Sequence, residues 1–467
     1  MSKRTGSQST KSKQKRPKKP GKLPKHLEHI NQMAAGIDIG SSSHFVAIPE
    51  GLDEVSVKEF KSFTADLCQL ANWLERCGIK TIAMESTGVY WIPLYELLDS
   101  RGFDVKLVDA RKVKNVSGRK TDVLDCQWLQ QLHTYGLLGG AFRPDEQICI
   151  LRAYLRQRTM LIESAVRHIQ HIQKAMTQMN IQLHNVLSDI TGFTGMKIIR
   201  AIVAGERDPK RLAGYRHTNC KNTAEVIEKS LTGTYREEHL FTLTQALELY
   251  DEYQQKIGDC DKVIEQHLTT FAHSEPKTSQ AAVIRKTKSH CKNKLSFDAG
   301  NYLRKICGVD LTLIPGIEAS TALKVISEIG LDLSHWKNSK QFASWLGLCP
   351  GNKVSGGKKL SGKSKRCKNN AASILRMAAS TLHRSQSALG AFFRRIKSRL
   401  GAPKATTAAA HKLATIIYSM LKNGTEYRET GQDYYEQKYH HRMVRNLQSR
   451  AKKLGFTLIE TNVLSVS

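Results

Sequence analysis

The segment AAGIDIG, residues 34–40, decides the fold of the first third of the chain. Its apolar run ends at Asp38, which is typical of a buried strand whose last side chains emerge at the edge of a sheet. The run from Ile79 to Met84 ends in the same way, at Glu85. We therefore expect both carboxylates near the carboxyl edge of one sheet.

Two further acids, Asp122 and Asp125, lie in the segment KTDVLD. On a helix that continues through Trp128 and Leu132, their i, i+3 spacing places both carboxylates on one side. Hard divalent cations such as Mg²⁺ take oxygen ligands, and a pair of them can activate a nucleophile and stabilise a leaving oxygen in phosphoryl transfer. The four acids therefore form a candidate metal site for nucleic-acid chemistry.

Apolar runs alternate with helical segments around these acids, from residue 34 to residue 143. This alternation predicts a three-layer α/β domain. The expected strands are 34–39, 43–49, 55–63, 81–86 and 105–110, and the expected helices are 64–77, a segment after Val89, and the segment that carries Asp122 and Asp125.

The next segment, residues 145–275, changes to helical periodicity. Two apolar seams with seven-residue spacing predict a long helix over 145–190, which forms a coiled coil between protomers or packs on the chain's own helices. Gly205, Asp208 and Pro209 indicate a break, and residues 274–304 read as a basic linker. The seams are Leu155, Ile162, Ile169, Met176 and Leu183, with Ala165, Ile172, Met179 and Val186.

Charge is strongly positive and segregated along the chain. The 467 residues hold 72 Lys and Arg against 42 Asp and Glu, so 72 − 42 = +30, which points to a polyanionic partner, with nucleic acid first. Residues 1–30 are expected to form a disordered basic arm. Eighteen Lys and Arg but no acid fall between Leu333 and Thr425, so that interval cannot supply a carboxylate-bound metal.

The ten cysteines are scattered without CxxC pairs, which predicts reduced thiols in a cytoplasmic protein. No apolar run approaches the roughly 18 residues of a membrane span. We therefore expect no membrane association.

The segment GIDIGSSS suits two functional classes. One is a ribonuclease-H-like domain with an aspartate on its first strand, and the other is the phosphate loop of an actin-like ATPase. The ATPase interpretation expects a second DxG loop after a strand, and the chain offers only Asp298 to Gly300, without a preceding strand. The order of the four acids favours the nuclease-like interpretation.

The segment LTLIPGIEASTALKVISEIG, residues 311–330, resembles a helix-hairpin-helix. Such turns present backbone N–H groups to DNA phosphates, which makes Gly316 a candidate nucleic-acid contact. Glu318 stands where these hairpins usually carry a second glycine, and a carboxylate there would repel phosphate. A purely structural helical hairpin is therefore the alternative.

The segment GLCPGNKVSGGKKLSGKSKR, residues 347–366, is the most unusual in the chain. Ser355, beside two glycines, is a candidate nucleophile because the backbone there can approach a ligand closely. Taken alone, the segment favours a flexible basic loop that contacts DNA over a catalytic one. Its candidate phosphate ligands are Lys353, Lys358, Lys359, Lys363, Lys365 and Arg366.

The motifs GIDIGSSSH, MESTGVYW, KTDVLDCQWL, FASWLGLCPG and VSGGKK, in this order, resemble the DEDD transposases of bacterial insertion sequences, the family numbered one hundred and ten. The resemblance implies a RuvC-like domain over 34–143, a coiled-coil region over 145–275, a mainly α-helical transposase domain over 305–430 and a helical tail over 431–467. It carries the family's acids to Asp38, Glu85, Asp122 and Asp125 and its catalytic serine to Ser355, with Ser361 as a minor rival.

The same resemblance implies a DNA recombinase that uses Mg²⁺, with Mn²⁺ as the alternative, and a covalent 5′-phosphoserine intermediate. It further implies a homo-oligomer, dimer or tetramer, that acts on element ends and target DNA under the guidance of a bridge RNA. Three other classes stay open. They are a metal-only nuclease of the Holliday-junction type, an actin-like ATPase and a noncatalytic nucleic-acid-binding protein.

Overall fold

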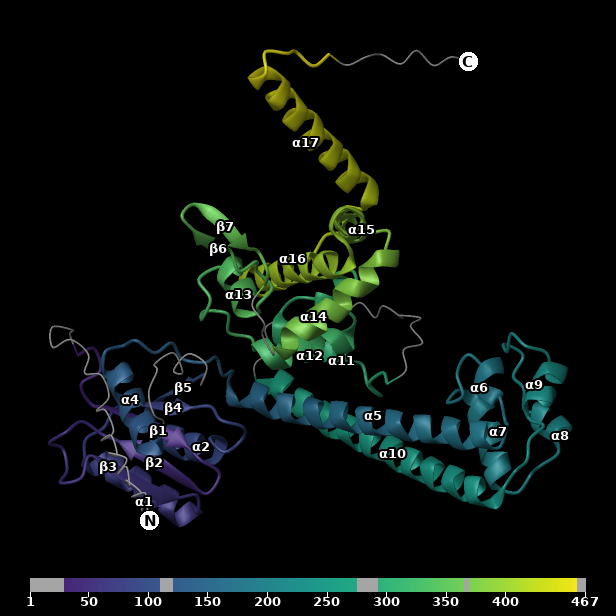
Figure 1. Ribbon diagram of the computed structural model, residues 1–467, viewed down its shortest axis with the longest axis horizontal. Helices are drawn as coiled ribbons and strands as arrows, with labels where there is room; N and C mark the ends of the chain where they lie inside the picture. The colour runs from purple at the N-terminus through teal and green to yellow at the C-terminus, as the bar shows by residue number, and fades with distance from the viewer. Residues whose placement is uncertain (1–28, 110–120, 275–292, 365–368, 460–467) are drawn as a thin grey trace, which may run out of the picture. The chain divides into compact units, whose positions relative to one another are not determined.

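The computed structural model describes residues 29–109, 121–274, 293–364 and 369–459 (Figure 1). The chain divides into two compact units, Met1–Arg143 and Pro144–Ser467. The predicted basic arm lies outside the described residues except for its last two positions, and so does most of the predicted 274–304 linker.

The N-terminal unit is built on a five-stranded sheet with the order β3-β2-β1-β4-β5. β1, β2 and β3 form an antiparallel meander, whereas β4 pairs in parallel with both β1 and β5. This mixed sheet confirms the predicted ribonuclease-H-like α/β fold. The strands are β1 (Ala34–Ile39), β2 (Ser43–Ala47), β3 (Val57–Lys61), β4 (Thr81–Glu85) and β5 (Asp104–Val108).

Helices cover both faces of this sheet. Because successive side chains of a strand point to opposite faces, Ile37 and Met84 pack in one core with α1 and α2. The other face meets α4, where the Thr81 hydroxyl oxygen lies 2.8 Å from Nε2 of the buried His133. The three helices are α1 (Thr64–Arg76), α2 (Ile92–Ser100) and α4 (Asp122–Thr134).

The second unit begins with two long helices, α5 (Glu146–Gln178) and α10 (Glu237–Ser274), which pack along each other. Contacting pairs run in opposite order along the two helices, so the helices are antiparallel. The apolar stripe of α5 therefore packs on a helix of the same chain. The pairs are Gln147 with His267, Arg158 with Asp261 and His168 with Tyr253.

The expected helix over 145–190 was too long, because α5 ends at Gln178. Asn180 adopts a left-handed backbone with φ 58°, which an α-helix does not accommodate. Leu183 and Val186 then pack in an apolar core that short helices form with the last turns of α5 and the first turns of α10. The short helices are α6 (Leu183–Val186), α7 (Phe193–Val203), α8 (Pro209–Ala213) and α9 (Ala224–Ser230).

The rest of the second unit is mainly helical, as predicted. α13, α14 and α15 all pack on α16, whose buried alanines, such as Ala405 and Ala409, permit close approach. A small β-hairpin, β6 (Lys353–Ser355) and β7 (Lys358–Ser361), interrupts the helices. The helices are α11 (Ala299–Cys307), α12 (Ala319–Ile329), α13 (Ser339–Trp345), α14 (Asn370–Thr381), α15 (Ala388–Leu400), α16 (Ala402–Asn423) and α17 (Gln432–Lys453).

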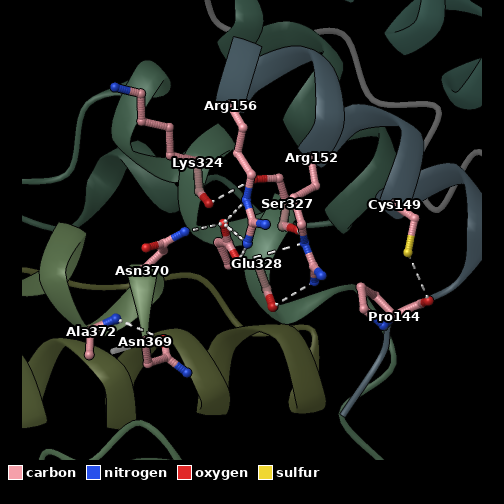
Figure 2. A network of polar contacts seen from close by, with 10 residues as sticks. All are labelled: Pro144, Cys149, Arg152, Arg156, Lys324, Ser327, Glu328, Asn369, Asn370 and Ala372. Carbon is pink, nitrogen blue, oxygen red and sulfur yellow. Dashed lines mark hydrogen bonds and ion pairs between the residues drawn. The ribbon is translucent and has the colours of Figure 1, made fainter. Parts of the chain in front are cut away.

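A polar junction joins α5 to α12 and α14 (Figure 2). Arg156 holds the Glu328 carboxylate with its Nε 3.1 Å from Oε1 and its Nη2 2.9 Å from Oε2. Arg152 donates to the carbonyl oxygen of Ser327 at 2.8 Å, and Asn370 donates to Glu328 Oε1 at 3.1 Å. The 12% exposure of the Glu328 side chain makes this a shielded contact between three helices.

None of the helices in the described ranges is long and apolar enough to span a lipid bilayer.

Candidate active site

Asp38 and Glu85 lie at the ends of two neighbouring parallel strands. β1 and β4 pair as far as Ile37 and Met84, so the two acids follow at the next position of the register. Side chains alternate along a strand, so Glu85 shares the face of Thr81, whose hydroxyl contacts α4. The strand ends therefore direct both carboxylates toward the α4 side of the sheet.

Gly36 allows α4 to pack closely against this face of the sheet. A Cβ on Gly36 would stand 2.3 Å from the backbone nitrogen of Gln130 and 2.4 Å from the carbonyl oxygen of Cys126. Only glycine fits there, and its absent side chain lets the helix lie directly on the strand. Asp38, two residues farther along the same face, meets the preceding turn of α4, which carries the predicted acid pair.

The start of α4 is fixed by a cap. The Thr121 hydroxyl accepts a hydrogen bond from the backbone nitrogen of Leu124 at 3.3 Å, so Asp122 is the first residue of the helix. Asp125 follows within the same turn. The positive end of the helix dipole stabilises carboxylates at this place.

The four acids form one electrostatic cluster. Burial, followed by the charges of Glu85, Asp125 and Asp122, raises the pKa of Asp38 to about 6. Burial and the charge of Asp38 raise the pKa of the neighbouring Cys126 thiol to about 12, so the thiol stays protonated at neutral pH. The structure thus brings together the acids that the sequence places on two strands and one helix.

This donor set fits a divalent metal ion. Asp38, Glu85, Asp122 and Asp125 would hold the ion through oxygen atoms, and its charge would relieve the repulsion that raises the pKa of Asp38. Within the described ranges, no three His, Cys, Asp or Glu side chains lie close enough together to hold a metal ion as they stand. Glu85 accepts a hydrogen bond from the Thr87 hydroxyl at 3.0 Å.

Ser355 lies at the tip of the β6–β7 hairpin, directly opposite Lys358. Gly356 and Gly357 make the connection with positive φ angles of 55° and 74°, which suits a two-residue turn. The glycines and lysines here predict a loop, because both residue types are poor strand formers. The structure instead shows an exposed hairpin, which leaves the Ser355 side chain accessible.

Ser361, the alternative candidate for the catalytic serine, lies on β7 opposite Lys353. Its hydroxyl accepts a hydrogen bond from the backbone nitrogen of Lys363 at 3.3 Å. Lys359 also belongs to β7, and Lys358 and Lys363 are exposed. The two other predicted phosphate ligands, Lys365 and Arg366, lie outside the described residues. Ser355 and these lysines belong to the second unit and the four acids to the first.

Gly316 lies in the turn of a helical hairpin between α11 and α12. Its φ is 84°, and a Cβ there would stand 3.0 Å from both the Ala378 carbonyl oxygen and the Thr381 hydroxyl oxygen of α14. These contacts account for the glycine structurally. Glu318 is exposed at the start of α12.

Sequence reasoning missed two residues that hold these elements in place. Gly36 was unassigned, although a glycine two positions before a functional acid on a buried strand signals close contact with a helix. Glu328 was also unassigned, and it joins α5 to the first residue of α14, the helix that follows the hairpin. Its place as one of the last two acids before the acid-free interval, with Asp332, was the available signal.

Two regions of the chain match known protein families. Residues 35–181 match the transposase family DEDD_Tnp_IS110, and this range contains all four acids. Residues 310–394 match the transposase IS116/IS110/IS902 family, and this range contains the hairpin with Ser355. A comparison with curated proteins gave no match.

These matches agree with the geometry of both regions. DEDD transposase domains generally use divalent metal ions, and transposases bind DNA, cut it and rejoin it. With a DEDD domain in its N-terminal unit and an IS110-type transposase region in its second unit, the chain is a transposase of the IS110 family.

Proposed function

We propose that this transposase cuts and rejoins DNA through a covalent 5′-phosphoserine intermediate on Ser355. Asp38, Glu85, Asp122 and Asp125 bind Mg²⁺ in this proposal, with Mn²⁺ as the alternative ion. The observation that carries it is the cluster in which three carboxylates and burial raise the pKa of the fourth to about 6. Such a cluster is unfavourable by itself and becomes favourable when it binds a cation.

The serine chemistry balances without an external energy source. Ser355 Oγ bonds to the scissile phosphorus, its proton passes to a base, and the bond to the 3′ oxygen breaks as that oxygen takes up a proton. A 3′-hydroxyl of the new partner strand then attacks the phosphoserine and releases the Ser355 hydroxyl. Lys358, across the hairpin from Ser355, supplies positive charge for the phosphate oxygens.

A divalent ion, when bound, supplies Lewis-acid stabilisation of negative charge on phosphate oxygens. The four acids would bind this ion, and the neighbouring carboxylates raise the proton affinity of Asp38. The acids belong to the first unit of the fold and the serine to the second, so the proposal assigns metal binding and the nucleophile to different units.

A bridge RNA and a homo-oligomer complete the proposal. The net charge of +30 suits a bulky polyanion recognised by its backbone, and the family resemblance supplies the guide. Protein freed of RNA by nuclease treatment should lose target-specific cleavage and regain it when the element's noncoding RNA is added. Light scattering of the RNA-bound protein should show a dimer or tetramer.

Cleavage of a supercoiled plasmid that carries the element ends tests the proposed metal site. Asp122→Asn should abolish Mg²⁺-dependent cleavage, whereas Asp99→Asn, at an exposed position of α2, should not change it. Mg²⁺-dependent cleavage by the Asp122→Asn variant would contradict the proposed metal site. Cleavage that survives in Ser355→Ala would favour the metal-only nuclease.

One structural observation disfavours the actin-like ATPase. Asp298, in the one possible second phosphate loop, caps helix α11, where its Oδ1 accepts a hydrogen bond from the backbone nitrogen of Gly300 at 3.1 Å. It therefore serves the start of a helix and does not end a strand.

A further inference from the structure

Helix α17, Gln432–Lys453, has a distinctive surface. It contains no buried residue and lies outside both regions that match transposase families. From Gln437 to Ile459 the sequence contains no Asp or Glu, while it contains six Lys and Arg. A surface with this charge attracts a partner of the opposite sign.

Four of these charges lie on one face of the helix. Lys438, Arg442, Arg445 and Lys452 follow one another at separations of four, three and seven residues, so their side chains share one side, and all four are exposed. The face extends over about 21 Å at 1.5 Å per residue. Arg450, five residues after Arg445, points away from it.

The base of α17 is anchored through its tyrosines, of which Tyr435 lies seven residues before Arg442 and near its charge. The Arg395 guanidinium of α15 lies 3.7 Å from the ring centroid of Tyr439 and 4.7 Å from that of Tyr435. Arg394 Nη2 donates to Gln432 Oε1 at 2.7 Å. Figure 1 shows α15 against the first turns of α17. This packing holds the helix, and the four basic side chains remain exposed.

We propose that this basic face, made of Lys438, Arg442, Arg445 and Lys452, binds the phosphate backbone of duplex DNA. The major groove of B-DNA admits an α-helix, whereas the narrow major groove of A-form RNA does not. A straight helix with one basic side therefore fits a DNA duplex better than an RNA duplex. The proposal deepens the DNA-handling function and is independent of Ser355, since backbone binding requires no cleavage.

The test measures binding of the full chain to a fluorescent DNA duplex by anisotropy in EDTA, which excludes metal-dependent cleavage. Each lost phosphate contact lowers the slope of log affinity against log salt by about 0.9. In the variant K438Q/R442Q/R445Q/K452Q, the magnitude of this slope should therefore be smaller by about 3 to 4 than in the wild type. Arg445→Gln should lower it by about 1, and Arg450→Gln, which removes the same charge from another face, should leave it unchanged.

Circular dichroism of each variant should show an unchanged helix content, which separates lost contacts from lost folding. Equal effects of Arg445→Gln and Arg450→Gln would overturn the proposed face. The fourfold variant should lose more affinity for the DNA duplex than for an RNA duplex of the same sequence or for vesicles of anionic phospholipid. A larger loss for the RNA or for the vesicles than for the DNA would overturn the assignment to DNA. An unchanged slope in the fourfold variant would overturn the whole proposal.

Discussion

Gly36 and Gln130 are in such close contact that a Cβ on Gly36 would stand 2.3 Å from the backbone nitrogen of Gln130. This contact lets α4 lie directly on β1 and brings Asp122 and Asp125 next to Asp38. The proposed metal site therefore depends on a glycine that itself has no ligand atom.

Replacing Gly36 with alanine should push α4 away from the sheet. Overpacking of this kind costs about 1–3 kcal/mol, and the displaced acids should bind metal more weakly. Urea unfolding and Mn²⁺ titration of the variant measure the two effects. Gly258→Ala in α10, where an added Cβ meets nothing within 4 Å, should be neutral or stabilising by about 0.5–1 kcal/mol. Wild-type stability and metal affinity in Gly36→Ala would contradict this role.

Asp38 should make the metal-free protein less stable as the pH rises. Its pKa is about 6 in the folded chain against an ordinary 3.8, so the folded state holds the extra proton between these values. The unfolding free energy should therefore fall between about pH 4 and pH 6, by about 1 kcal/mol after allowance for solvent screening. Thermal melts of Asp38→Asn should lack this fall.

The difference between wild type and Asp38→Asn is the quantity to compare, because His133 titrates in the same window. Burial lowers the pKa of His133 to about 4 from an ordinary 6.5, so its contribution to stability rises with pH between these values. Saturating Mg²⁺ should cancel the Asp38 effect in the wild type. Identical pH profiles for the two proteins would contradict the charge cluster.

The buried pair Arg158–Asp261 should hold α5 to α10. Arg158 Nε lies 2.5 Å from Asp261 Oδ1, and the two side chains are 3% and 4% exposed. Arg158 also donates to the carbonyl oxygens of Asn293 and Lys294 at 3.1 Å. Asp261→Asn should therefore cost about 3–5 kcal/mol, because it leaves a buried charge unpaired.

Chemical denaturation followed by circular dichroism measures this cost. The double replacement Arg158→Met with Asp261→Leu should recover part of the loss, because it removes both charges. A single variant as stable as the wild type would show that the pair does not join the helices.

Glu328 should fix α14 to α5. Glu328→Gln keeps the side-chain shape but removes the charge that holds Arg156, and hydrogen bonds to charged groups contribute about 1.5–3 kcal/mol. Amide hydrogen exchange should speed up in the first turn of α14. Glu252→Gln, in an exposed i, i+4 pair with Lys256, should change stability by no more than about 0.5 kcal/mol. Unchanged exchange in Glu328→Gln would contradict the proposed junction.

The sheet and its acids were predictable because the physical signals are local. Apolar runs that end at Asp38 and Glu85 indicate buried strands, and the spacing of Asp122 and Asp125 indicates a helix face. The parallel pairing of β1 with β4 then places these ends together.

Other features depend on contacts that the sequence does not display. The end of α5 is set by the left-handed conformation of Asn180, which the continuing apolar stripe conceals. The hairpin around Ser355 depends on a Gly356–Gly357 turn, although its composition predicts a loop. The proposed role of Ser355 comes from family resemblance, because a serine among lysines, taken alone, favours a DNA-contacting loop.

Capture of a serine–DNA covalent complex tests the proposed role of Ser355 directly. The RNA-loaded protein is incubated with Mg²⁺ and an element-end DNA with a nick near the cleavage site, then denatured, digested and analysed by mass spectrometry. We predict a DNA adduct on the peptide that carries Ser355, its loss in Ser355→Ala, and its retention in Ser361→Ala. An adduct that persists in Ser355→Ala would contradict the account.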